Sequence, residues 1–158
     1  MLDFYNCFEY NMNDMNSYKR TRILYLFLTI FLLSVGALIY ILFRQGTYIH
    51  KWFEELIPGF INCFENTASD LKLIKFLKYY FVDFVWCLAL NFSLLAVLDF
   101  KKTFYAVGFA SAVFGFLFEL AQLLDFVSGT FDFIDVVMYI IASLCAVMVN
   151  IKIIKRMD

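Results

Sequence analysis

The chain has 158 residues, of which 63% are hydrophobic and 17% are charged, and its mean hydropathy is +0.77. An ordinary soluble domain has roughly 45–50% apolar and about 25% charged residues, and a domain of this size could not bury so much apolar surface. The composition therefore excludes a disordered chain, a disulfide scaffold and a typical soluble enzyme, and it indicates an integral membrane protein. A net charge of −1 without a basic stripe gives no sign of nucleic-acid binding.

Four runs of sequence are long and apolar enough to cross a membrane as helices, for which about 20 residues are needed. They are residues 23–43, 79–98, 103–124 and 133–151. Each must be helical because lipid offers no partner to open backbone groups. Residues 1–22 are then expected to be a cytoplasmic N-terminal tail, and residues 23–158 a four-span membrane domain. Short connections after the first loop favour an all-α, up-down-up-down four-helix bundle.

The distribution of Lys and Arg predicts the orientation of these spans. With the N-terminus inside, eight basic residues lie on the inner side and five on the outer side, so both termini are expected to be cytoplasmic. The inner set is Lys19, Arg20, Arg22, Lys101, Lys102, Lys152, Lys155 and Arg156, and the outer set is Arg44, Lys51, Lys72, Lys75 and Lys78.

The five outer basic residues all belong to the long first loop, residues 44–78, which Pro58 and Gly59 divide into two pieces. The second piece, from Asp70 onward, repeats a lysine every third residue between apolar residues. This pattern predicts an amphipathic helix in the outer interface, with Lys72, Lys75 and Lys78 facing anionic lipid headgroups. The alternative is a helix packed over the bundle with its lysines simply solvated, and the sequence leaves both open.

Small and polar residues recur at helical spacing in the last three spans, so each set lies on one helix face. For Gly108, Ala112 and Gly115 we expect helix packing, because small residues let helices approach closely in lipid. The first span has fewer such residues and is expected to be peripheral and lipid-facing. The sets are Asp83, Cys87, Asn91; Gly108, Ser111 or Ala112, Gly115, Glu119, Gln122; and Asp135, Tyr139, Ala142, Ala146.

Acidic residues inside the spans are more informative, because a carboxylate at the membrane centre costs about 2.5–3.5 kcal/mol on insertion scales. The topology brings four of them together near one membrane surface, which the predicted orientation makes the outer leaflet. Gln122 and Thr130 lie beside them. The four are Asp83, Glu119, Asp132 and Asp135.

So many acids cannot all be ionised without a partner, and three arrangements would resolve this. Glu119, the deepest acid, is protonated; or Asp83, Glu119 and Asp135 hold a divalent cation; or a cationic group of a substrate or lipid headgroup enters. The structural alternatives are that Asp132 and Asp135 cap the last helix and that Glu119 forms a hydrogen bond that orders the bundle.

Two segments near this cluster resemble VanZ-like membrane proteins. They are Phe118-Glu119-Leu120-Ala121-Gln122, an ExxQ pattern late in one span, and Ser128-Gly129-Thr130-Phe131-Asp132-Phe133-Ile134-Asp135, a Gly-containing turn with an Asp that opens the last helix. The resemblance covers roughly residues 79–150 and marks Glu119, Gln122, Gly129 and Asp135. Members usually carry Arg and Asn where Thr130 and Tyr139 stand, so the chain resembles a divergent member. The resemblance implies that the protein lies in a bacterial cytoplasmic membrane and is linked to glycopeptide resistance.

Two main function classes follow from these observations. In the first, Glu119 and Gln122 are candidate catalytic residues of an outer-leaflet site for a cation or lipid headgroup, and Asp83, Thr130, Asp132 and Asp135 bind the ligand. In the second, the protein is a non-catalytic subunit that binds itself or another membrane protein through its small residues. A transporter is weaker, since acids on one side give no path across. No Ser/His/Asp set, HExxH or phosphate-binding loop fixes a reaction.

Overall fold

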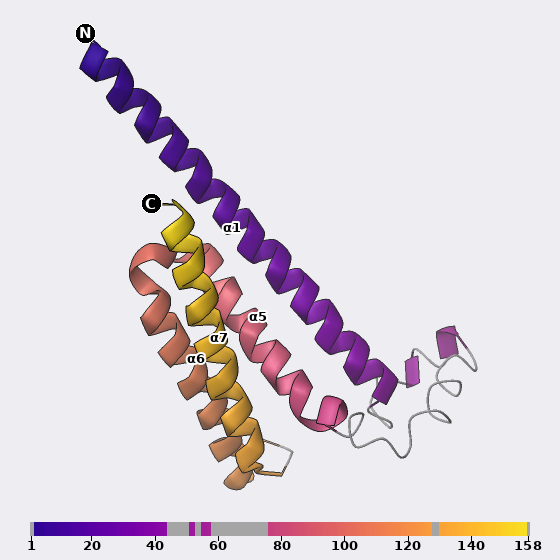
Figure 1. Ribbon diagram of the computed structural model, residues 1–158. Coiled ribbons are helices and arrows are strands. Elements are labelled where there is room, and N and C mark those ends of the chain that lie inside the picture. Colours follow the sequence, from indigo (N-terminus) through magenta and orange to yellow (C-terminus); the bar gives the residue numbers. More distant parts are fainter. Residues whose placement is uncertain (1, 44–50, 53–54, 58–75, 128–129, 158) are drawn as a thin grey trace.

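The computed structural model describes residues 2–43, 51–52, 55–57, 76–127 and 130–157, and the secondary-structure elements within these ranges are all helices, without a strand (Figure 1). The main elements are helix α1 (Leu2–Phe43), a five-residue π-helix η1 (Leu77–Phe81), α5 (Val82–Val97), α6 (Phe100–Leu123) and α7 (Phe133–Met157). Four stretches have the length and hydropathy of membrane spans, which confirms the predicted all-α, four-span architecture. These are Asn16–Leu42, Tyr79–Val97, Phe100–Leu123 and Phe133–Met157.

The N-terminal segment is helical. Residues 1–22 are predicted to be a cytoplasmic tail, and α1 is continuous from Leu2, with its apolar span beginning at Asn16. The reason is that neither Gly nor Pro occurs before Gly36, so nothing in the sequence breaks the helix. In Figure 1, α1 therefore extends well past the other three helices at its N-terminal end.

The four helices run in alternating directions, so that α1 begins and α7 finishes at the same end of the molecule (Figure 1). We call this the termini end, and it also contains the short connection between α5 and α6 at Leu98 and Asp99. The opposite end, where α6 connects to α7 and α5 begins, is called the acidic end. All eight residues of the predicted inner basic set belong to helix segments at the termini end.

The first outer loop, residues 44–78, lies mostly outside the described residues, and so does most of the predicted amphipathic helix, including Lys72 and Lys75. The described part of this loop includes Trp52, which is exposed. The interfacial helix of this loop therefore stays a prediction.

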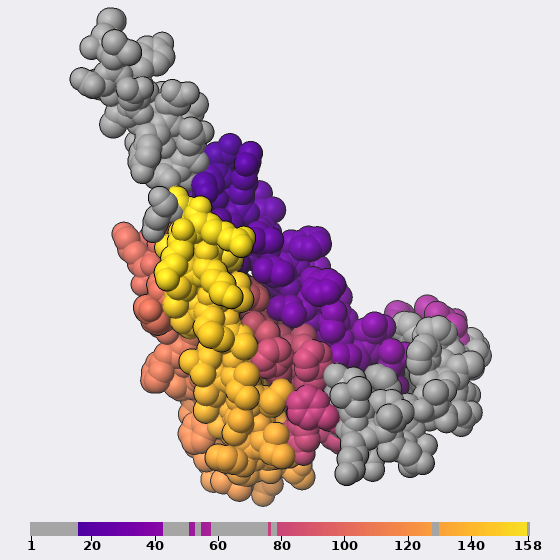
Figure 2. Space-filling view, viewed as in Figure 1, coloured from indigo at the N-terminus to yellow at the C-terminus, as the bar shows by residue number. Residues whose placement is uncertain are grey.

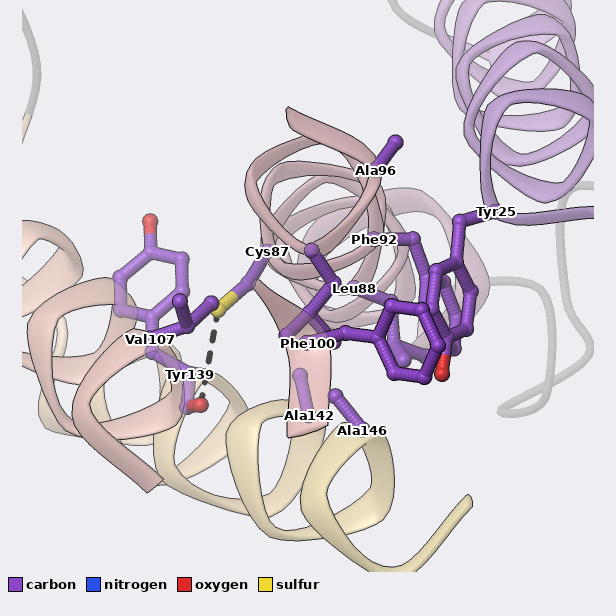
Figure 3. Packing of buried hydrophobic residues seen from close by; sticks show 11 residues of the cluster. Tyr25, Cys87, Leu88, Phe92, Ala96, Phe100, Val107, Tyr139, Ala142 and Ala146 are labelled. Carbon is purple, nitrogen blue, oxygen red and sulfur yellow. Dashed lines mark hydrogen bonds between the residues drawn. The ribbon is translucent and has the colours of Figure 1, made fainter. Parts of the chain in front are cut away.

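Helix α1 packs against α5, and much of its apolar surface faces outward, as expected for a peripheral span (Figures 1 and 2). Among the side chains of residues 16–42, the most deeply buried is Tyr25, whose ring stacks on Phe92 at 5.7 Å and meets Phe100 edge-on at 5.6 Å (Figure 3). The Tyr25 hydroxyl donates to the side-chain oxygen of Asn150, whose Nδ2 donates in turn to the carbonyl of Phe100 at 3.1 Å. This chain of contacts joins all four helices.

A second set of polar contacts holds α1 at the termini end. The hydroxyl of Tyr18 donates to the carboxylate of Asp99, and the guanidinium of Arg22 donates to the carbonyl of Leu98 at 3.4 Å. The hydrogen bond from Tyr18 and the Lys102 ammonium, 3.8 Å from Asp99, hold the pKa of the Asp99 carboxyl below its ordinary value. The connection between α5 and α6 is thereby tied to the first helix.

Removing the Tyr25 hydroxyl is expected to destabilise the protein, because the buried side-chain oxygen of Asn150 loses its donor. For Tyr25→Phe we expect the free energy of unfolding in detergent to fall by about 1–3 kcal/mol. Tyr105→Phe is the matched control, since Tyr105 is exposed on α6, and it should have no effect. Equal stability of the two variants would contradict the role given to Tyr25.

The contact at Asp99 predicts a pH dependence. A carboxyl whose pKa is lowered by folding stabilises the fold above its unfolded-state pKa of about 3.9, and this stabilisation disappears as the pH falls through the folded-state value. The thermal midpoint should therefore drop less between about pH 5 and pH 2 in Asp99→Asn than in the wild type. Asp125→Asn, at an exposed acid of the other end, should follow the wild type. Superimposable curves for Asp99→Asn and the wild type would refute this expectation.

Candidate functional site

The structure brings two of the predicted acids together around one hydroxyl group. Asp83 lies in the first turn of α5, Glu119 lies near the end of α6, and Tyr139 lies in the second turn of α7. The Tyr139 oxygen is 3.2 Å from Oδ1 of Asp83 and 3.5 Å from Oε1 of Glu119. Three helices thus meet at this point, as the four-span topology predicted for the acids.

Glu119 is the most deeply placed of these groups, with 2% of its surface exposed. Its second oxygen, Oε2, accepts a hydrogen bond from the backbone N–H of Asp132 at 3.2 Å. Asp132 directly precedes α7, so this carboxylate lies at the positive end of a helix dipole, where negative charge is stabilised. The burial of Glu119 is therefore supported by a backbone donor as well as by Tyr139.

The carboxylate of Asp132 has a separate role in the structure. Its Oδ1 accepts a hydrogen bond from the backbone N–H of Ile134 at 2.9 Å, which is the geometry of a helix N-cap. The capping alternative therefore describes what this side chain does. Asp135, one turn into α7, is half-buried, and both acids lie near enough to Tyr80 of η1 to act on it electrostatically.

Two other predicted site residues are not drawn into this group of contacts. Gln122 is half-buried, and the hydrogen bonds that join Asp83, Glu119, Asp132 and Tyr139 do not involve it. Thr130 is exposed in the connection before α7, and Gly129, which the VanZ-like resemblance marks, lies outside the described residues. The connection includes Asp125 at a φ of 57°, a left-handed conformation that Asp tolerates better than most residues.

The predicted divalent-cation site is not assembled. No three His, Cys, Asp or Glu side chains in the described ranges gather closely enough to hold a metal ion, and this includes the predicted set Asp83, Glu119 and Asp135. The Tyr139 hydroxyl instead lies between two of these carboxylates, and Oε2 of Glu119 accepts a backbone amide.

Tyr139 was missed as a site residue, although its position was visible in the sequence. It lies four residues after Asp135, on the same helix face as the small residues of α7. Its ring fits because Gly115 faces it: a Cβ atom at position 115 would come within 2.5 Å of ring carbons of Tyr139. A buried hydroxyl opposite a glycine, one turn from an intramembrane acid, was the signal that could have identified it.

The predicted packing glycines of α6 contact α7 of the same chain. Gly108 of α6 faces Val147, whose methyl group would be 2.7 Å from an added Cβ atom, and Gly115 faces Tyr139. Ala112, between them, is half-buried. These residues let α6 and α7 approach closely, so their presence does not by itself favour an association with a second protein.

Comparisons with known proteins give no relative. No protein-family model matches the chain, and no curated protein and no solved structure matches it significantly. The resemblance to VanZ-like proteins therefore stays a prediction that rests on the residues quoted above, and what the chain does must be argued from its own geometry.

The fit between Gly115 and Tyr139 can be tested by adding one methyl group. Gly115→Ala should displace the Tyr139 ring and lower the free energy of unfolding by about 1–3 kcal/mol. If the displacement moves the hydroxyl from the carboxylates, Tyr139→Phe should cost less in the Gly115→Ala background than in the wild type. Ala110→Val, on the exposed face of α6, is the control. Additive effects of the two substitutions would argue against this coupling.

Proposed function

We propose that this chain is a multi-pass protein of the bacterial cytoplasmic membrane, a divergent relative of VanZ-like proteins, whose acidic end binds a cationic lipid headgroup from the outer leaflet. The observation that carries the proposal is the buried carboxylate of Glu119, which shares a single hydroxyl donor with Asp83. Intramembrane acids that are kept at this cost are functional candidates by default.

The Tyr139 hydroxyl can donate only one hydrogen bond, which explains why a cationic ligand suits the site. A phenol has one hydrogen to donate, so it cannot donate to Asp83 and to Glu119 at the same time. When it donates to Asp83, the nearer group at 3.2 Å, Oε1 of Glu119 faces the lone pairs of the phenol oxygen. An ammonium group has three donors and a positive charge, and would stabilise both carboxylates.

An organic ammonium group fits these contacts better than a divalent metal ion. Metals such as Mg²⁺ and Ca²⁺ require several oxygen ligands around one point, and the described residues supply no such group of three side chains. Asp83, Asp132 and Asp135 are half-exposed at the same end of the bundle as Glu119 and would form the entrance. An amine-bearing lipid headgroup is therefore the ligand class that we propose.

The proposed orientation is supported by the charges at the two ends. The eight basic residues of the inner set belong to the termini end, and an excess of Lys and Arg is typical of the cytoplasmic side. The acidic end would then face the compartment in which cell-envelope precursors are handled. This is the side on which a link to glycopeptide resistance, implied by the resemblance, would operate.

Binding can be measured as a shift in the thermal midpoint of the detergent-solubilised chain. Lysophosphatidylethanolamine should raise the midpoint of the wild type by several degrees, because a ligand that binds the folded state stabilises it. The shift should disappear in Glu119→Gln, which keeps the size of the side chain but removes its charge. Lysophosphatidylglycerol, which has no amine, and magnesium chloride should give no comparable shift.

Asp125→Asn is the matched control for this experiment, because Asp125 is an exposed acid at the same end, and the hydrogen bonds of Glu119 and Tyr139 described above do not involve its side chain. It should keep the full response to the amine lipid. A response that persists in Glu119→Gln, or one that both lipids produce equally, would refute the proposal.

A further inference from the structure

A second polar group lies deeper in the bundle, away from the acids. It consists of Cys87 and Asn91 of α5, Ser111 of α6 and Ser143 of α7, all buried with at most 5% of their surface exposed. We call these four residues the polar layer. The amide Nδ2 of Asn91 donates to the carbonyl of Cys87 at 2.9 Å and to Oγ of Ser143 at 3.5 Å, and the Cys87 sulfur lies 3.6 Å from the same Oγ.

The contacts between α6 and α7 place Ser111 in this layer. Gly108 faces Ser143 and Val147 of α7, and Gly115 faces Tyr139. Since the two helices are antiparallel (Figure 1), Ser111, which lies between the two glycines and is 1% exposed, is level with Ser143. The layer is therefore formed by three helices.

Two atoms of the layer have unused hydrogen-bonding capacity. Oδ1 of Asn91 and Oγ of Ser111 are buried and have no hydrogen-bond partner among the described residues. Buried polar groups in native proteins nearly always have a partner, either protein or ordered water, and in a membrane an unsatisfied group is costly. The Asn91 oxygen is an acceptor, and the Ser111 hydroxyl is both a donor and an acceptor. A small molecule with two donors and two acceptors can therefore form a hydrogen bond with each of them.

The layer is connected to the acidic end by polar or small residues at steps of four. These are Asp83, Cys87 and Asn91 on α5; Glu119, Gly115 and Ser111 on α6; and Tyr139 and Ser143 on α7. Such steps keep each set on one helix face, and the eight-residue step from Glu119 to Ser111 covers about 12 Å along the axis. Toward the termini end, the buried apolar side chains of Phe92, Leu95 and Ala146 close the interior.

Tyr139 contributes to both groups. Its hydroxyl reaches the carboxylates of the acidic end, while its backbone carbonyl accepts a hydrogen bond from the Cys87 thiol at 3.6 Å. Figure 3 shows the sulfur of Cys87 directed at this carbonyl, with the Tyr139 hydroxyl pointing away from it. The polar layer and the acidic site are therefore adjacent, because Tyr139 contacts both of them.

We propose that the polar layer is a water-binding site: a water molecule bridges Oδ1 of Asn91 and Oγ of Ser111, and it exchanges with solvent at the acidic end along the three polar helix faces. The apolar side chains beyond the layer make this path a blind one, open to one side of the membrane. The proposal does not depend on which ligand the acidic end binds.

The thiol of Cys87 provides a direct probe, because its S–H stretch in the infrared spectrum shifts when deuterium replaces hydrogen. In the full chain with Cys7→Ser, Cys63→Ser and Cys145→Ala, the detergent-solubilised protein is transferred to D₂O. We expect the Cys87 thiol to exchange at least about tenfold faster than a thiol in the dry core, which must wait for local opening of the structure. The control thiol is Ala96→Cys in a Cys87→Ala background, since Ala96 lies on the same helix with 7% exposure, against 5% for Cys87.

Two further variants locate the water. Ser111→Ala and Asn91→Leu, each with Cys87 as the single cysteine, should slow the exchange toward the control rate, while circular dichroism shows that the helices are retained. Should Asn91→Leu fail to fold, Ser111→Ala alone decides, because it removes one oxygen atom and no helix contact. Exchange of Cys87 as slow as that of the control thiol would overturn the proposal, and so would fast exchange that Ser111→Ala leaves unchanged.

Discussion

The structure depends on one constraint: inside a membrane, a polar group must find its partner within the protein, because lipid supplies none. Glu119 meets this constraint by accepting the amide of Asp132 and by approaching the hydroxyl of Tyr139. Both partners belong to the start of α7 or precede it directly, so the carboxylate ties the end of α6 to the beginning of the last helix. The acidic end is thus an arrangement of donors around a buried acceptor, as well as a cluster of charges.

Close approach of the helices is what makes these partners available. Gly115 leaves the space that the Tyr139 ring occupies, and Gly108 brings Val147 and Ser143 toward α6. A larger residue at either position would separate α6 from α7 and draw the hydroxyl away from Glu119. Packing and polar satisfaction are therefore not independent here, since the small residues of α6 determine which hydrogen bonds α7 can form. The same principle applies at the other end, where the buried Tyr25 reaches Asn150.

The sequence predicted the parts of this structure that hydropathy and topology determine. Four spans, their approximate limits and the convergence of Asp83 with Glu119 follow from run lengths and from the alternation of direction. The detailed partners could not be predicted, because Tyr139 reads as an aromatic residue of a helix face until the glycine opposite it is known. The polar composition of residues 1–15 gave no apolar periodicity from which the helical continuation of α1 could be predicted, although no helix-breaking residue occurs there.

The length of α1 has a mechanical consequence. A helix of 42 residues is about 63 Å long at 1.5 Å per residue, roughly twice the thickness of the hydrocarbon core at about 30 Å. No Gly or Pro interrupts it before Gly36, so it is one continuous helix that begins before the apolar span at Asn16 and passes the Tyr18, Arg22 and Tyr25 contacts. A force or torque applied to the protruding turns would therefore be transmitted to Asp99 and Asn150, so that this first helix acts as a lever on the remaining three.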